Sequence, residues 1–281
     1  MKLSIIGSGF SPLQGGGRYL IMNAIRKYPR TRHLIGSRLQ PGDEDLDAVP
    51  VSELRGKHVV IEEKMDGANC GISFGPDYAL RLQSRGHYLI GGPRERQFDL
   101  LKQWAGAISD RLLDRLTDRF VMYGEWMYAK HTVYYDALPH FFMEFDILDT
   151  EAGVFLDTPR RAGLLADLPV KPVKVLFAGE FPGEEYLQTL VGPSHFVTPN
   201  APTQMREGVA RLGWDVERAV RQTDLSGVME GLYVKVEEDG AVTERYKFVR
   251  AEFLQTVTAD GHWQDRPLVP NRLAEGAELF E

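Results

Sequence analysis

From residue 59 onward, the sequence breaks into short apolar segments, and this pattern limits the fold more than any other feature. Each segment is bounded by Gly, Pro or Asp and has the length and texture of a β-strand. The strand-like segments are 59–64, 71–74, 79–85, 120–126, 140–148, 231–237 and 244–250. The last two flank Glu238-Asp239-Gly240, a hairpin signal. The pattern predicts a fold rich in antiparallel sheet.

Three stretches between these strands have the spacing of helices. The longest, 97–120, places its apolar residues at helical intervals: Leu100, Leu101, Trp104, Ile108, Leu112 and Leu116. Residues 158–167 carry Pro159 in the first turn, where helices accept proline. Residues 203–222 form the third stretch. Strands and helices together predict an α+β fold.

Composition narrows the class of protein. The chain has 281 residues, 43% of them hydrophobic and 26% charged, which is ordinary for a globular protein with a sizeable core. No apolar run approaches the roughly 18–20 residues that span a bilayer. Cys70 is the single cysteine, so an internal disulfide is excluded and a cytoplasmic location is expected. The glycine-rich segments 7–9 and 15–17 lack the spacing of a dinucleotide-binding turn and are expected to be loops.

The segment 62–69, Glu-Glu-Lys-Met-Asp-Gly-Ala-Asn, carries the strongest chemical signal. It places Lys64 at the end of an apolar strand and just before a glycine turn. A lysine is a useful nucleophile only when neutral, so we expect its surroundings to lower its pKa. Gly67 lets a backbone approach a ligand closely. A match of this length also occurs by chance, so the interpretation depends on motifs further along the chain.

Such motifs follow in a fixed order, and together they resemble the covalent nucleotidyltransferases: DNA ligases, RNA ligases and mRNA capping enzymes. The segments that resemble the successive family motifs are 64–67, 84–86, 123–126, 142–147, 230–235 and 245–250. The resemblance runs from about Glu62 to Arg250. It implies an antiparallel-sheet-rich adenylation domain of the ATP-grasp-like ligase type over 59–250, with a small N-terminal accessory segment over 1–58 and a short extension over 251–281.

Within this superfamily, segment 125–131 and the following 138–142 look most like ATP-dependent RNA ligases. DNA ligases and capping enzymes carry an additional oligonucleotide-binding barrel after the motif that 245–250 resembles. Here 31 residues follow Arg250, too few for such a barrel. This difference favours an RNA ligase.

The resemblance also implies roles for individual residues. Lys64 would attack the α-phosphate of ATP and hold AMP. Cations aimed at the phosphates would stabilise the charge that develops there. The implied catalytic residues are Lys64, Lys247, Glu230 and Lys235, and the candidate ligands of Mg²⁺ or Mn²⁺ are Glu230 and Asp146. Each of these two carboxylates is as readily explained as the partner of a lysine. Arg245 stands where the family usually has a lysine, and arginine does not reproduce a compact ammonium.

The implied contacts to the cofactor ATP involve Glu63 (through its backbone), Asp66, Gly67, Asn69, Glu125, Phe145 and Arg245. Phe145 would stack on the adenine and Glu125 would bind the ribose hydroxyls. A buried strand aromatic and an edge-strand carboxylate are the ordinary alternatives for these two. Asp66 and Asn69 are also common turn-forming residues.

Contacts to RNA are expected from Arg85, Lys130 and His131. The net charge is −7, yet segment 26–38 carries five Arg or Lys residues and no acid. Such a segment suits a nucleic acid backbone or forms a solvated basic loop. Tyr134 and Tyr135 fit either RNA contact or strand packing.

The resemblance therefore implies an ATP-dependent RNA ligase that joins a 5′-phosphate to a 3′-hydroxyl through lysyl-AMP and an adenylylated RNA end. This activity suggests a role in RNA repair, with an end-healing kinase or phosphatase as a partner and no membrane. Three alternatives remain open at this point: a DNA nick ligase, a capping guanylyltransferase and a non-catalytic RNA-binding relative.

Overall fold

The computed structural model describes residues 25–39, 43, 45–253 and 268–280. The segments 7–9 and 15–17, which the sequence predicts to be loops, lie outside these residues. The strands are β1 (Arg32–His33), β2 (His58–Lys64), β3 (Ala68–Phe74), β4 (Leu80–Ser84), β5 (Phe120–Trp126), β6 (Phe142–Asp149), β7 (Val154–Leu156), β8 (Lys171–Pro172), β9 (Val175–Glu180), β10 (Gly231–Glu238) and β11 (Ala241–Val249). The α-helices are α2 (Asp99–Ala107), α3 (Ser109–Leu116), α4 (Thr158–Leu164), α5 (Glu184–Thr189), α6 (Ala201–Arg211) and α7 (Val216–Arg221), and short 3₁₀ helices cover Val51–Leu54 and Pro93–Phe98.

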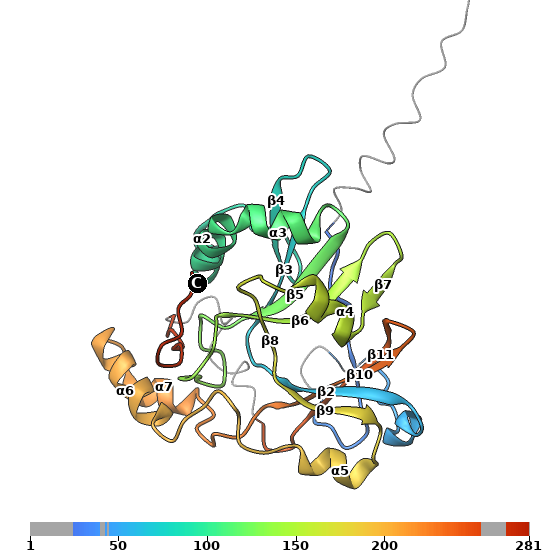
Figure 1. Ribbon diagram of the computed structural model, residues 1–281. Helices are drawn as coiled ribbons and strands as arrows, with labels where there is room; N and C mark the ends of the chain where they lie inside the picture. The colour runs from blue at the N-terminus through green and yellow to red at the C-terminus, as the bar shows by residue number, and fades with distance from the viewer. Residues whose placement is uncertain (1–24, 40–42, 44, 254–267, 281) are drawn as a thin grey trace, which may run out of the picture.

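The described strands form one hydrogen-bonded sheet in the order β4-β3-β5-β6-β7-β11-β10-β2-β9, with β1 beside β11 and β8 beside β6. Every neighbouring pair along the main path is antiparallel, which confirms the expected sheet type. The three-residue strand β7 joins two halves of this sheet. We call β4-β3-β5-β6 the upper wall and β11-β10-β2-β9 the lower wall, after their positions in Figure 1.

Each wall has its own apolar core. On the upper wall, α2 and α3 lie beside β3 (Figure 1). Their side chains Leu101, Trp104 and Leu112 belong to the same buried cluster as residues of β3 and β5. On the lower wall, the cluster includes Val59 and Leu232. Burying these side chains is the main favourable contribution to folding, about 1.5–3 kcal/mol for each large aliphatic residue.

Two expected helices are each divided in the structure. The stretch 97–120 becomes α2 and α3, because the backbone at Ile108 (φ −113°, ψ 18°) leaves the helical region, and β5 already begins at Phe120. The stretch 203–222 becomes α6 and α7, separated at Gly213 with φ 71°. The hairpin signal is confirmed: Asp239 and Gly240 both have positive φ, 51° and 82°, between β10 and β11.

Segments outside 59–250 also contact the sheet. Strand β1 pairs in parallel with β11, and Leu34 and Leu54 are buried in the core of the lower wall. Near the other end, Asn271 bonds to the carbonyl of Met127 at 2.7 Å. No helix among the described residues is long and apolar enough to cross a membrane.

Candidate active site

The register of the lower wall aligns the motif residues on one face. Lys64 of β2 lies opposite Gly231 of β10, and Tyr233 lies between Glu62 of β2 and Lys247 of β11. Successive side chains of a strand point to opposite faces, so Glu62 and Lys64 share a face. That face forms one side of a pocket.

The pocket combines residues from both walls and from the segment before β1. It is lined by Tyr28, Pro29, Thr31, Glu62, Glu63, Lys64, Met65, Asn69, Arg85, Glu125, Phe145, Val173, Tyr233 and Lys247. Seven residues predicted for the site from the sequence are therefore brought together here: Glu63, Lys64, Asn69, Arg85, Glu125, Phe145 and Lys247. Glu230 is not a lining residue, but its carboxylate is paired with Lys64 at the pocket.

Lys64 forms an ion pair with Glu230, with Nζ 2.7 Å from Oε2. The Lys64 side chain is 20% exposed and that of Glu230 is 1% exposed. Burial alone would lower the pKa of Lys64, but Glu230, with smaller effects from Glu125 and Asp66, raises it above the ordinary value. The expectation of a lowered pKa is therefore wrong for the chain without ligands, because three acids surround the amine.

Glu125 stands on the upper wall, where β5 pairs it with Asn69 of β3. Burial, reinforced by the charges of Glu230 and Asp66, raises the pKa of Glu125 to about 8 against the opposing effect of Lys64. Its Oε2 atom is buried without a hydrogen-bond partner. An oxygen of this kind can accept a bond from a ligand hydroxyl.

Aromatic rings fill the end of the pocket away from Lys64. Phe145 lies 6.2 Å from Tyr233 between ring centroids, and Tyr28 contacts Phe145 edge-on at 5.0 Å. Tyr28 also packs against Tyr123 and Phe155. Tyr28 was not identified from the sequence, because it lies in a segment notable only for its basic residues.

A buried charge network lies behind these rings. Lys235 Nζ is 2.8 Å from Glu62 and 3.7 Å from Asp146, and Arg245 Nε is 3.2 Å from Asp146. Arg161, which the sequence analysis missed, is a third cation 3.3 Å from Glu62. Lys235, Asp146 and Arg245 are thus partnered by one another and are not among the lining residues.

Lys247 lines the pocket and is held from behind by Asp43, to which its Nζ donates a hydrogen bond. Burial and the nearby charge of Lys64 lower the pKa of Lys247, although Asp43 opposes this effect. Arg30 pairs with Asp45 at 2.6 Å and with Asp43 at 3.4 Å. Part of the positive charge of the basic segment 26–38 is therefore paired with acidic residues of the same chain.

Asp66 and Gly67 shape the turn after Lys64. The Asp66 Oδ2 atom accepts bonds from the backbone N–H groups of Thr132 and Val133 at 2.6 and 2.8 Å, so it ties this turn to the segment after β5. A Cβ atom at Gly67 would lie 2.5 Å from Sδ of Met127. Both residues were predicted to contact ATP; neither is a lining residue of the pocket, and these contacts fix the turn after Lys64.

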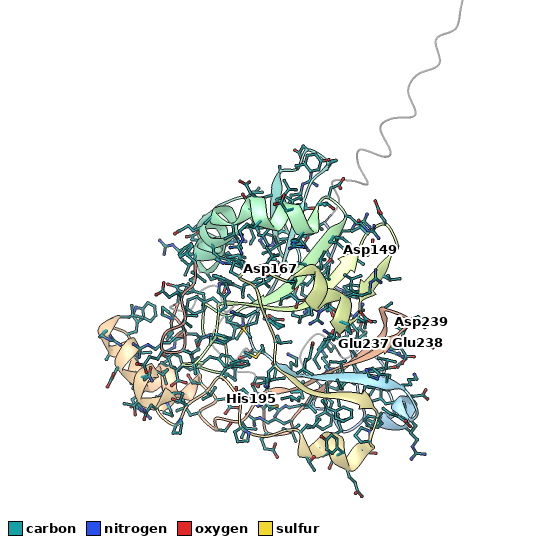
Figure 2. The ribbon with its side chains drawn as sticks, viewed as in Figure 1. Asp149, Asp167, His195, Glu237, Glu238 and Asp239 are labelled. Atoms are coloured by element: carbon teal, nitrogen blue, oxygen red, sulfur yellow. The ribbon has the colours of Figure 1, made fainter. Side chains whose placement is uncertain are left out.

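The Glu63 side chain points away from the pocket. Its carboxylate accepts bonds from Ser194 Oγ at 2.6 Å and from the backbone N–H of His195 at 3.2 Å, and it lies 2.8 Å from His195 Nδ1. Figure 2 labels His195, on the segment that this carboxylate holds beside β2. The backbone N–H of Glu63 donates to the carbonyl of Lys174 at 2.9 Å.

The other RNA candidates differ in position. Arg85 is exposed and lines the pocket. Lys130 donates to the carbonyls of His131 and Gln222, both at 2.9 Å, and neither Lys130 nor His131 is a lining residue. Tyr134 and Tyr135 are 3% and 1% exposed, so packing is the correct explanation for both.

The described residues hold no group of three His, Cys, Asp or Glu side chains arranged to bind a metal by themselves. Mg²⁺ commonly uses one or two protein carboxylates and completes its coordination with phosphate oxygens and water. Glu230, paired with Lys64, is the predicted metal ligand that lies beside this pocket.

Comparison with solved structures shows similarity to structures of an RNA ligase from Naegleria gruberi. A mutant with ATP and Mn has a TM-score of 0.47 and 17% identity over 71% of this chain and 51% of that chain. The same ligase with PPi has a TM-score of 0.46 and 17% identity over 80% and 56%. The chain thus spans about half the length of these structures. A search of curated proteins gives no match.

A model of the RNA ligase family matches residues 57–249, which is more than half of the chain and contains β2 through β11. The matched range includes Lys64, Glu125 and Glu230. The chain therefore belongs to the RNA ligase family.

Proposed function

We propose that this protein is an ATP-dependent RNA ligase that works through a covalent lysyl-AMP. The observation that carries the proposal is the position of the Lys64 amine, inside a pocket with Glu230 at 2.7 Å and the orphaned Glu125 oxygen nearby. Membership of the RNA ligase family supports the same conclusion.

In the first step, the neutral amine of Lys64 attacks the α-phosphorus of ATP. A nitrogen–phosphorus bond forms, the bond to the bridging oxygen breaks, pyrophosphate leaves and the amine loses a proton. In the second step, an RNA 5′-phosphate oxygen attacks the same phosphorus and releases Lys64. In the third, a 3′-hydroxyl attacks the activated 5′-phosphate, loses its proton and displaces AMP. Holding the reacting groups in position should supply much of the acceleration.

The other lining residues bind the nucleotide in this scheme. Phe145 stacks on the base, and the Glu125 carboxylate accepts the ribose hydroxyls, which favours its charged form. Lys247 and Arg85 face the phosphates, with Arg85 exposed for the RNA 5′-phosphate. Lys235 and Arg245 act from behind the pocket wall, through Glu62 and Asp146.

The residues present fit one Mg²⁺ or Mn²⁺ ion held by Glu230 together with ATP phosphate oxygens and water. When bound, the ion supplies positive charge that favours the neutral form of Lys64 and offsets phosphate charge. Asp146 already accepts bonds from Tyr28 and Arg245, and we assign it to fixing these groups.

The test is mass spectrometry of the protein after incubation with ATP and Mg²⁺. We expect an added AMP on the peptide that contains Lys64, and none in Lys64→Ala. Lys57→Ala, which removes the lysine just before β2 and outside the pocket, should keep the adduct. AMP on any other residue would refute the assignment.

The acceptor is tested separately, because DNA ligases and capping enzymes share the first step. Adduct formation with GTP in place of ATP would favour a guanylyltransferase. Sealing of a nicked duplex should require a 5′-phosphate and a 3′-hydroxyl on RNA and should be weaker on DNA. Ends prepared by a kinase or phosphatase are its natural substrates in this proposal.

A further inference from the structure

Three hydroxyl groups form a hydrogen-bonded chain at the aromatic end of the pocket. Tyr28 Oη donates to Asp146 Oδ2 at 2.6 Å. Tyr28 Oη and Tyr233 Oη lie 2.6 Å apart, and Tyr233 Oη lies 2.9 Å from Thr31 Oγ1. All three hydroxyl-bearing residues line the pocket, whereas Asp146 is fully buried behind it.

The carboxylate at one end fixes the direction of every bond in this chain. Each hydroxyl has a single proton, and an ionised carboxylate can only accept. Asp146 Oδ2 also accepts from Arg245 Nε at 3.2 Å. Because the Tyr28 proton goes to Asp146, Tyr233 must donate to Tyr28. Thr31 must then donate to Tyr233, and the Thr31 oxygen retains only acceptor capacity.

The base of a bound nucleotide belongs at this end of the pocket. Lys64, which takes up the α-phosphate, lies opposite Gly231, two residues along β10 from Tyr233. Two residues of a strand span about 7 Å, roughly the separation that a ribose requires between phosphate and base. Phe145 and Tyr233 are the rings beside which a purine would lie.

We propose that Thr31 reads the 6-position of the purine and makes the protein select ATP over nucleotides with a 6-keto group. Adenine carries an amino donor at this position, whereas guanine carries a carbonyl acceptor. An acceptor-only Thr31 oxygen bonds to the amino group and opposes the carbonyl. Tyr28, Tyr233 and Asp146 are positioning residues, because they set the direction of the Thr31 hydroxyl. The inference rests on the proposed function, in that it takes the pocket to bind ATP.

Tyr28 and Thr31 both precede residue 57, where the match to the family begins. The described part of the N-terminal segment therefore supplies the group that discriminates between bases, while the matched range supplies the nucleophile.

The experiment compares ATP with inosine triphosphate, which has a 6-keto group in place of the 6-amino group. We expect the rate of adduct formation on Lys64 to favour ATP, and Thr31→Val to reduce the ATP-to-ITP ratio on the order of tenfold, as for loss of one hydrogen bond. Tyr28→Phe should reduce the ratio too, because Tyr233 can then donate to Thr31 and free the Thr31 proton for a keto oxygen.

Tyr123→Phe is the matched control. The Tyr123 ring lies 5.1 Å from that of Tyr28, but its hydroxyl donates to the carbonyl of Arg26 and is outside the chain of hydroxyls. Its ratio should equal that of the unmodified protein. A role of Tyr28 limited to packing would leave the ratio unchanged in Tyr28→Phe as well.

The outcomes separate the two proposals. If the adduct forms but Thr31→Val and Tyr28→Phe keep the original ratio, the inference is overturned and the proposed function stands. If no adduct forms with either nucleotide, the proposed function fails. Dissociation constants for AMP and IMP, which cannot react, then test the inference directly: equal changes for both nucleotides in Thr31→Val would overturn it.

Discussion

Lys64 Nζ and Glu230 Oε2 lie 2.7 Å apart in an ion pair whose acidic partner is almost fully buried. The pair holds the amine in the pocket, but it also holds the proton that, under the proposed function, the amine must lose before it can attack. The same carboxylate is our candidate metal ligand. Under the proposed function, Glu230 therefore has opposite effects on Lys64 in the presence and absence of a metal ion.

The first prediction separates these effects. In Glu230→Gln without metal, the pKa of Lys64 should fall, because its nearest negative charge is lost and burial remains. An amine-selective acylating reagent at pH 8 should then modify Lys64 severalfold faster, as measured by peptide mapping. Adenylation with ATP and Mg²⁺ should nevertheless become much slower. Glu238→Gln, on the exposed end of β10, should change neither rate, and normal adenylation in Glu230→Gln would remove Glu230 from the metal site.

The second prediction concerns Glu125 and pH. The folded protein keeps a proton on Glu125 up to about pH 8, whereas the group titrates near 4.5 in a model compound. The folded state thus binds more protons between these values, and the free energy of unfolding should fall as pH rises through this window. Glu125→Gln should lack this loss. Urea unfolding at pH 5, 6.5 and 8 should show the variant becoming more stable relative to the original protein as the pH rises. A difference in unfolding free energy that does not change with pH would contradict the assignment.

The third prediction tests the close packing of β10 and β11. A Cβ atom at Gly231 would lie 2.0 Å from the Phe248 carbonyl oxygen, so Gly231→Ala must displace the backbone beside Lys64. We expect a loss of about 3 kcal/mol in unfolding free energy and slower adenylation. Gly86→Ala is the matched control, since a Cβ atom there meets nothing within 4 Å and should cost less than about 0.5 kcal/mol.

The fourth prediction concerns Asp66. Asp66→Ala leaves the N–H groups of Thr132 and Val133 without their carboxylate partner, which should cost about 3 kcal/mol. The exposed Asp77 bonds to one backbone N–H at 3.3 Å, and Asp77→Ala should cost about 0.5 kcal/mol or less. Denaturant unfolding measures both. Equal losses in the two variants would show that Asp66 does not tie the turn to the segment after β5.

The sequence could predict elements with a clear local pattern. β5 has the predicted ends, Phe120 and Trp126, and the hairpin before β11 has the predicted turn. Apolar spacing in 97–120 correctly identified Trp104 and Leu112 as buried but gave no sign of the break between α2 and α3. Spacing reports which face is buried, and that face continues across the break.

Elements that depend on distant partners could not be predicted. β7 and β8 have only three and two residues, and the sequence of the six-residue β9 carries no alternation strong enough to mark a strand. Motif order brought Lys64 and Glu230 to one site but could not show that a carboxylate 166 residues away faces the amine. Tyr28 and Thr31 gave no signal, because their role comes from the position of Tyr233 and Asp146.

The connection that β7 makes between the two walls has a consequence for the order in which pyrophosphate leaves and RNA binds. Phe155 pairs with Leu148 of β6 and with Val242 of β11, so the two walls are hydrogen-bonded to each other at the aromatic end of the pocket. Under the proposed function, the base occupies that joined end, and pyrophosphate must leave from the side of the α-phosphorus opposite the Lys64 amine. The incoming RNA 5′-phosphate must attack from the same side, because each displacement is in line. The two cannot occupy that side together, so initial-rate plots should show the parallel lines of a ping-pong enzyme.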